Sequence, residues 1–235
     1  MDTKTRHSLK QDRFAKATAS SMSWVSGHRS GVMRSVIIAV VVVVAGVGAL
    51  VYADWSSGKA DAALGAALDT YTAPLSQPGA PATSGVYATA GERAKAANQQ
   101  FVAVAKQYGW LAEGAKAHYF AGVTYRELGN NASAETELKA AAGSWNRELA
   151  NLAKLALAGL YHQMDRDSEA INIYKALADK PSETVPAAVA QLDLADLYAE
   201  EGKVEQARKL WATVKDADKE GMAGAIAAQK LGVKQ

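Results

Sequence analysis

The chain has no cysteine and only four histidines among its 235 residues. The lack of cysteine excludes disulfides, thiolate metal sites and cysteine nucleophiles. Beyond the N-terminal region the histidines are His118 and His162, and no further ligand types cluster near either one, so no metal site is expected. A glycine-rich phosphate loop, a Gly-x-Ser-x-Gly motif and a zinc motif are also absent. The sequence therefore predicts no enzyme and no cofactor.

A strong net charge is lacking too, since the formal value is +2. The charge is unevenly distributed: residues 1–34 hold seven basic and two acidic residues, whereas residues 54–235 hold 19 basic and 22 acidic ones. A mildly acidic body with interspersed charges argues against nucleic-acid binding. The basic tail is suited to enforcing membrane topology and to contacting anionic lipid headgroups.

Charge is missing altogether from residues 35–53, which read SVIIAVVVVVAGVGALVYA. A helix of this length extends for about 28 Å, close to the thickness of a bilayer core. The sequence therefore predicts a transmembrane helix at 35–53, with Tyr52 and Trp55 as an interfacial aromatic pair. Ala45, Ala49 and Ala53 form a small-residue stripe suited to helix packing in a membrane, although a Val/Ala-rich span also produces such stripes by chance.

Flanking charges set the expected orientation. Because basic flanks stay in the cytoplasm, the tail 1–34 is expected inside and residues 54–235 outside. In a bacterium this means an inner-membrane protein with a periplasmic body. A cleaved signal peptide ending at Ala53 is the alternative, but the apolar run and the preceding tail are longer than signal peptides usually have.

A five-residue pattern recurs three times after the span: a small residue, Tyr, a turn residue, Ala and a bulky apolar residue. The tyrosines are 36 and 37 residues apart and all internal offsets agree. The copies are Gly122, Tyr125, Gly129, Ala134, Leu138; Ala158, Tyr161, Asp165, Ala170, Tyr174; and Ala195, Tyr198, Gly202, Ala207, Trp211. Such a period predicts stacked helical hairpins, here at 112–144, 149–179 and 185–216.

The remaining segments complete an all-α architecture, a transmembrane helix followed by an α-solenoid. Helical spacing predicts an exit helix at 59–71 and a helix at 92–108, which together form an incomplete repeat. The segment 72–90, with three prolines, is a predicted linker. A short helix at 219–231 is expected to cover the last apolar face. The expected domains are a tail (1–34), a span (35–53), an exit helix with linker (54–90) and a repeat domain (91–235).

The repeated pattern resembles the tetratricopeptide repeat, whose small, Tyr, turn, Ala and aromatic positions it matches. Its period is longer than the family's 34 residues, and the family's early Trp is replaced by His118, Lys154 and Gln191. With its anchor and linker, the layout resembles a bacterial family that includes the ancillary subunit of the SecYEG translocon and relates to the repeat domain of the periplasmic cell-division coordinator. This resemblance implies a periplasmic repeat domain that contacts the translocon and periplasmic chaperones.

Arrays of this kind bind proteins through a groove lined by the first helix of each hairpin. The groove residues expected by position are Tyr119, Val123, Arg126, Leu155, Gly159, His162, Leu192, Asp196 and Ala199. The alternative is a groove covered by the helix at 59–71 or by a second copy of the chain. Two functions remain open: an ancillary binding module of the export machinery, and an envelope or cell-division scaffold that acts through self-association.

Overall fold

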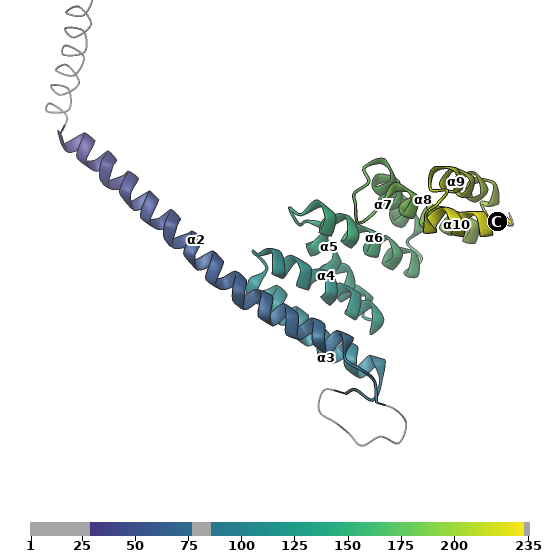
Figure 1. The fold of residues 1–235 in the computed structure, drawn as a ribbon, viewed down its shortest axis with the longest axis horizontal. Coiled ribbons are helices and arrows are strands. Elements are labelled where there is room, and N and C mark those ends of the chain that lie inside the picture. Colours follow the sequence, from purple (N-terminus) through teal and green to yellow (C-terminus); the bar gives the residue numbers. More distant parts are fainter. Residues whose placement is uncertain (1–28, 77–85, 233–235) are drawn as a thin grey trace, which may run out of the picture. The chain divides into compact units, whose positions relative to one another are not determined.

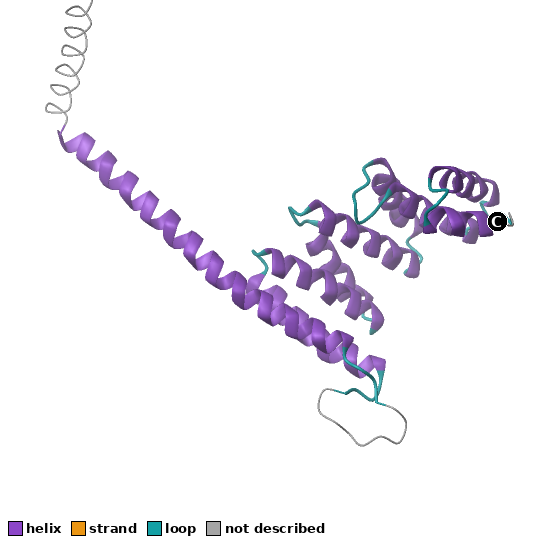
Figure 2. Ribbon diagram, viewed as in Figure 1, coloured by secondary structure: helices purple, strands orange, loops and turns teal. Residues whose placement is uncertain are grey.

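The computed structural model describes residues 29–76 and 86–232. This part of the chain is all-helical and contains no strand (Figure 2). Its helices are α2 Arg29–Thr72, α3 Ala90–Tyr108, α4 Ala112–Glu127, α5 Asn131–Ala142, α6 Arg147–Gln163, α7 Asp167–Asp179, α8 Ala187–Glu200, α9 Val204–Ala217 and α10 Met222–Lys230. The all-α prediction is confirmed for these residues. Most of the predicted tail (1–28) and the centre of the predicted linker (77–85) lie outside them.

Helix α2 is continuous over 44 residues and joins the predicted span to the predicted exit helix. Its stretch from Met33 to Thr72 includes a segment long and apolar enough to cross a membrane. The Tyr52 and Trp55 rings lie 6.1 Å apart near the end of this apolar segment. The chain divides into two compact units between Trp55 and Ser56, so that the last 17 residues of α2 belong to the second unit.

In the second unit each helix from α3 to α10 packs against the next one along the chain (Figure 1). Contacts also join α4 to α6 and α8 to α10, the first helices of successive hairpins. The hairpins are therefore layered in sequence order into a repeat-like helical body. Their observed ends agree with the predicted ranges to within a few residues.

The three repeated turns share one backbone geometry. Gly129, Asp165 and Gly202 have φ values of 75°, 57° and 78°, in the left-handed region that ends helices. The N–H of the next residue donates to the carbonyl of the repeat tyrosine, at 2.9 Å for Asn130 to Tyr125, 2.9 Å for Arg166 to Tyr161 and 2.8 Å for Lys203 to Tyr198. Asp165 thus adopts the conformation of the two glycines, as its place in the pattern predicts.

Small residues of the pattern let paired helices approach closely. Ala134, Ala170 and Ala207 are completely buried. A Cβ added at Gly122 would lie 2.6 Å from Cγ of Leu138, a distance that real Cβ contacts essentially never show. The α4–α5 hairpin is therefore packed more tightly than an alanine at this position would allow.

The segment Ser56–Thr72 of α2 pairs with α3, as the sequence predicts. Leu64 and Ala67 lie in one buried cluster with Phe101 of α3. The Tyr71 ring packs edge-on against Phe101, with centroids 6.1 Å apart, and Phe101 stacks on Phe120 of α4 at 5.2 Å. This aromatic cluster holds the segment of α2, α3 and α4 together as the first layer of the repeat body.

Candidate binding surfaces of the helical body

Predicted groove residues of the first two hairpins lie close together. Tyr119 of α4 and Leu155 of α6 are half-buried and pack against the same core cluster. The Arg126 guanidinium reaches α6, where it lies 3.6 Å from the position of a Cβ added at Gly159. Burial raises the pKa of the Tyr119 hydroxyl. These side chains, together with half-buried Val123, make a mixed apolar and cationic surface on α4 and α6.

His162 is engaged by carboxylates from two directions. Its Nδ1 lies 2.7 Å from Asp167 at the start of α7, and its Nε2 lies 2.9 Å from Glu200 at the end of α8. The hydrogen bond to Asp167 is the main cause that raises the histidine pKa, with a further contribution from Glu200. His162 therefore links two successive hairpins.

At the third hairpin the predicted groove residues serve internal packing. Leu192 is 9% exposed and lies in a core cluster with Trp211. Asp196 accepts hydrogen bonds from Trp211 Nε1 and Lys230 Nζ, both at 2.9 Å. Ala199 packs against the same cluster. The closing helix α10 thus packs on the face of α8 that carries these groove positions. Partner binding by Leu192 and Asp196 stays a prediction.

Asp193, which the sequence analysis did not single out, is a half-buried carboxyl of this region. Burial, with a smaller effect of Asp196, raises the pKa of Asp193 to about 6. Its charge in turn contributes to the raised pKa of Tyr174, whose main cause is burial. The sequence does contain a signal for this site. Asp193 is an acidic residue at a repeat position that is apolar in the other two hairpins, where it is Phe120 and Ala156.

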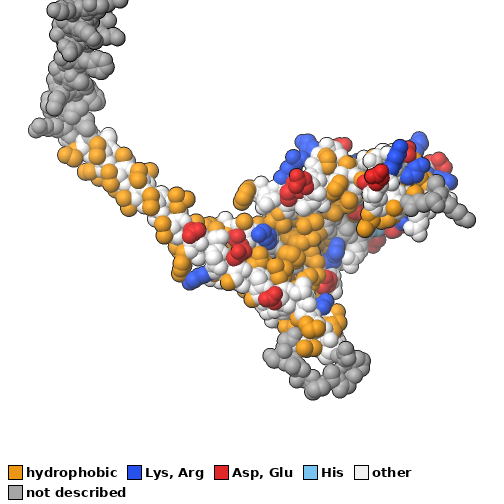
Figure 3. Space-filling model, in the orientation of Figure 1, with side chains coloured by type: hydrophobic (Ala, Val, Ile, Leu, Met, Phe, Trp, Pro, Cys, Tyr) orange, Lys and Arg blue, Asp and Glu red, His pale blue; other side chains and the backbone are white. Residues whose placement is uncertain are grey.

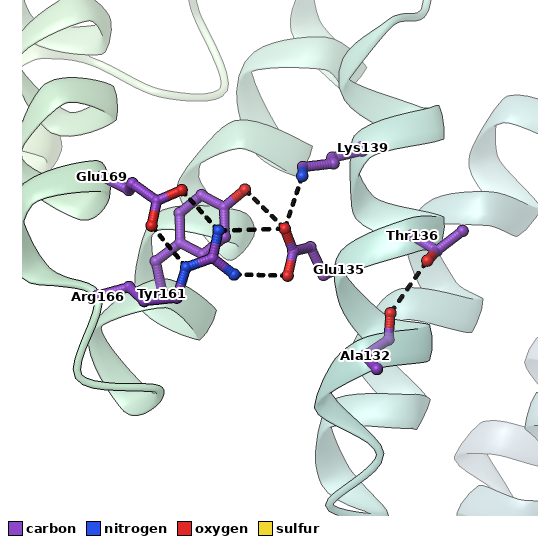
Figure 4. Close-up of polar contacts among 7 residues, drawn as sticks. All are labelled: Ala132, Glu135, Thr136, Lys139, Tyr161, Arg166 and Glu169. Carbon is purple, nitrogen blue, oxygen red and sulfur yellow. Dashed lines mark hydrogen bonds and ion pairs between the residues drawn. The ribbon is translucent and has the colours of Figure 1, made fainter.

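The contact of α5 with α6 and the start of α7, here called the first joint, is filled by an ion network (Figure 4). Glu135 accepts hydrogen bonds from Arg166 Nη1 at 2.7 Å, Lys139 at 2.6 Å and the Tyr161 hydroxyl at 3.1 Å. Arg166 also binds Glu169 at 2.5 Å, and its guanidinium lies 4.1 Å from the Tyr161 ring centroid. Arg166, followed by Lys139, lowers the pKa of Glu135 to about 2.

The second joint is the contact of α7 with α8 and the start of α9. Its backbone is arranged as in the first joint, but the equivalent positions hold different side chains. Ile171, Lys175, Lys203 and Gln206 stand where the first joint has Glu135, Lys139, Arg166 and Glu169. Lys203 Nζ lies 5.5 Å from the Tyr198 ring centroid, a cation–π contact equivalent to that of Arg166.

The second joint contains a cavity of about 450 Å³. Its lining residues are Lys175, Ala178, Asp179, Gln191, Leu194, Tyr198, Gln206, Lys209 and Leu210. Lys175 and Lys209 are exposed, and their ammonium groups make no hydrogen bond or ion pair within the described parts of the chain. The cavity therefore combines an apolar floor with two lysines that form no ion pair within the described residues, and one carboxylate, Asp179, also lines it.

No protein-family model matches this chain, and no curated protein is similar to it in sequence. Residues 29–76 and 86–232 also contain no group of three or more His, Asp or Glu side chains placed to hold a metal ion.

Proposed function

We propose that this chain is a membrane-anchored protein-binding module, with α2 as a single span, the N-terminus in the cytoplasm and a tetratricopeptide-like solenoid in the periplasm. Its role is binding, without catalysis. The exposed apolar segment of α2 and the basic residues that precede it support the anchor and its orientation. The layered hairpins and the shared turn geometry support the solenoid.

One observation carries the binding role: the second joint is open where the equivalent first joint is filled. A purely structural repeat gains stability from closing such a space, because an unfilled apolar surface forfeits packing contacts. Leu194, Leu210 and Tyr198 supply an apolar floor, and Lys175 and Lys209 supply cations at its rim. This chemistry fits a protein segment with a bulky apolar side chain next to an acidic residue.

The surface on α4 and α6 is the second expected contact. Tyr119, Leu155 and Arg126 present apolar and cationic groups there, which are suited to the same kind of acidic, amphipathic segment. The sequence resemblance to the ancillary translocon subunit supports translocon subunits and periplasmic chaperones as partners.

Site-specific photo-crosslinking in intact cells tests this function. A photoreactive residue is placed in the full-length chain at Gln206, in the cavity, and in a second variant at Tyr119. The matched control is Thr136, an exposed position on α5. We expect Gln206 and Tyr119 to capture translocon subunits or periplasmic chaperones that Thr136 does not capture.

Two charge reversals sharpen the test. Lys175→Glu with Lys209→Glu should abolish capture at Gln206, whereas Lys116→Glu, at an exposed lysine of α4, should not. Equal capture at all three positions would contradict the binding role. Capture of a second copy alone would favour the envelope scaffold, and capture of division proteins would favour that scaffold at the division site.

A further inference from the structure

The repeat body has two edges, one formed by the turns within hairpins and one by the loops between them. Because consecutive helices run antiparallel, the turns before α5, α7 and α9 lie at one edge and the loops before α4, α6, α8 and α10 at the other. The turns before α7 and α9 carry charges, with Asp165, Arg166, Glu201 and Lys203 among their residues, whereas the turn before α5, residues 128–130, carries none. The loops before α4 and α6 are charge-free over residues 107–112 and 140–146.

Each charge-free loop displays a tryptophan. Trp145 is 81% exposed and Trp110 is 57% exposed. Both line one cavity of about 400 Å³, together with Leu111, His118 and small residues, and no Asp, Glu, Lys or Arg contributes to the lining. Hydrophobic side chains project from the body at the α5–α6 loop (Figure 3). The two loops thus form one exposed aromatic patch.

The patch lies at the edge where the second unit begins. Thr70 is hydrogen-bonded to Gln100 and Ala73 to Arg93, so the end of α2 runs antiparallel to α3. The Ser56 end of this segment consequently lies beside the C-terminal end of α3, which leads into Trp110. Ser56 is three residues beyond Ala53, where the predicted span ends. The tryptophan loops therefore lie at the end of the second unit where the chain enters it from the predicted span.

The loops further from the anchored segment contain charged residues, as expected if only the nearer loops contact a membrane. The loop before α8 contains Lys180 and Glu183, and the loop before α10 contains Asp218, Lys219 and Glu220. Only the two loops nearest the anchored segment are free of charge and carry tryptophan. A general role in folding or solubility would not favour this gradient, because an exposed aromatic patch promotes association in water.

We propose that Trp110 and Trp145 insert into the headgroup region of the bilayer that α2 spans, as a second and peripheral membrane contact. The proposal rests on the membrane anchorage proposed above. Tryptophan is enriched at membrane–water interfaces because its ring is apolar and its N–H is polar. The anchor keeps the loops at a high effective concentration near the lipid, so that two side chains suffice without a basic patch.

Electron paramagnetic resonance on the full-length chain in phosphatidylcholine/phosphatidylglycerol vesicles tests this contact. Since the chain has no cysteine, Trp145→Cys introduces a unique site for a nitroxide label. Val204→Cys, at a 51% exposed apolar residue beside the charged turn, is the aqueous control, and Val47→Cys reports on the span itself. We expect the label at 145 to collide more often with oxygen than with a water-soluble nickel chelate. Its oxygen-to-nickel collision ratio should lie between the ratios of the labels at 204 and 47.

The outcomes separate the proposals. A lipid-exposed label at 47 with a water-exposed label at 145 would overturn the membrane contact alone. A water-exposed label at 47 would overturn the anchor and the contact together. A label at 145 that is shielded from both reagents and dipolar-coupled to another label would show that a second copy covers the patch, which also overturns the lipid contact.

A second series places the label at Ser144→Cys, and its reference variant retains both tryptophans. Replacing the rings by Trp110→Ser and Trp145→Ser should lower its oxygen-to-nickel ratio to the value measured at 204. The matched control is Met222→Ser, which removes an 81% exposed apolar side chain at the first residue of α10 and should leave the ratio unchanged. An unchanged ratio in the double tryptophan variant would overturn the proposal.

Discussion

The two joints between hairpins share a backbone plan but differ in how far their side chains fill the space between helices. The first joint is filled by Glu135, Lys139, Arg166 and Glu169, whose charges balance within the joint. The second joint has Ile171 in place of Glu135 and keeps a cavity with cations at its rim. The difference shows that the repeat pattern specifies the stacking of hairpins, while the positions between pattern residues decide whether a joint is filled or open.

The hairpins differ in a related way. The first has a glycine at its closest helix approach, Gly122, whereas the other two have Ala158 and Ala195. The first hairpin and the first joint therefore form the more closely packed half of the array. The open cavity lies in the other half.

The largest expected effect comes from making the first hairpin resemble the others. Gly122→Ala should destabilise the body by about 2 kcal/mol, because the added Cβ overlaps Leu138 in a filled core. Ala158→Gly, the reverse exchange in the second hairpin, should cost about 1 kcal/mol through helix propensity. Urea unfolding of the full chain in detergent micelles measures both. Equal costs would remove the distinction between the two hairpins.

The two joints should respond differently to pH. The pKa of Glu135 is lowered from 4.5 to about 2 in the folded chain, which stabilises the fold when the carboxylate is charged. This stabilisation is complete above pH 4.5, the pKa in the unfolded chain, and is lost as the pH falls through about 2. Glu135→Gln should therefore cost about 1–2 kcal/mol at pH 7 and little near pH 2. Ile171→Ala should cost a similar amount at both pH values, because it removes apolar packing. Denaturation series of both variants across this range check the contrast, and parallel pH responses would contradict it.

Removing the half-buried charge of Asp193 beside the second joint should increase stability. The Asp193 pKa is raised to about 6, so the folded state holds its proton more tightly than the unfolded state, and stability falls as pH rises from 3.8 to 6. Allowing for its partial exposure, Asp193→Asn should stabilise the chain by about 1 kcal/mol at pH 7.5 and have almost no effect below pH 3.8. A loss of stability at pH 7.5 would show that the carboxylate has a favourable partner.

The smallest expected effect concerns the link between the second and third hairpins. The raised pKa of His162 gives a stabilisation that is fully present below 6.5 and is lost as pH rises through the higher folded pKa. Because His162 and Glu200 are partly exposed, His162→Gln should cost about 0.5 kcal/mol at pH 6 and nothing at pH 9. Thermal unfolding at the two pH values measures the difference, with Asp167→Asn expected to show the same trend.

Local signals in the sequence predicted most of the helices. The turns at Gly129, Asp165 and Gly202 follow from the repeated offsets, and the structure places all three in the left-handed region. The predicted span and the predicted exit helix form one continuous helix, α2. No proline lies between Ala53 and Lys59. Helix formation is cooperative, so the helix continues through Ser57 and Gly58 although this pair is common in turns.

The candidate binding surfaces were only partly predictable. Position in the repeat identified Tyr119, Arg126 and Leu155, which do lie close together on α4 and α6. It also selected Leu192 and Asp196, which pack against the closing helix α10. The cavity of the second joint was missed, since its lining residues come from three consecutive helices and helical spacing does not show which of their side chains meet.

The sequence by itself determined the periodic features of this protein: the apolar run of α2, the hairpins, their turns and their small contact positions. These depend on residues within one or two helical turns of each other, where backbone sterics and spacing suffice. Only the tertiary structure decided that Glu135 meets Arg166, that the second joint keeps a cavity, and that Trp110 and Trp145 share one patch. Those contacts depend on side-chain volumes and directions across different helices, which no single stretch of the sequence contains.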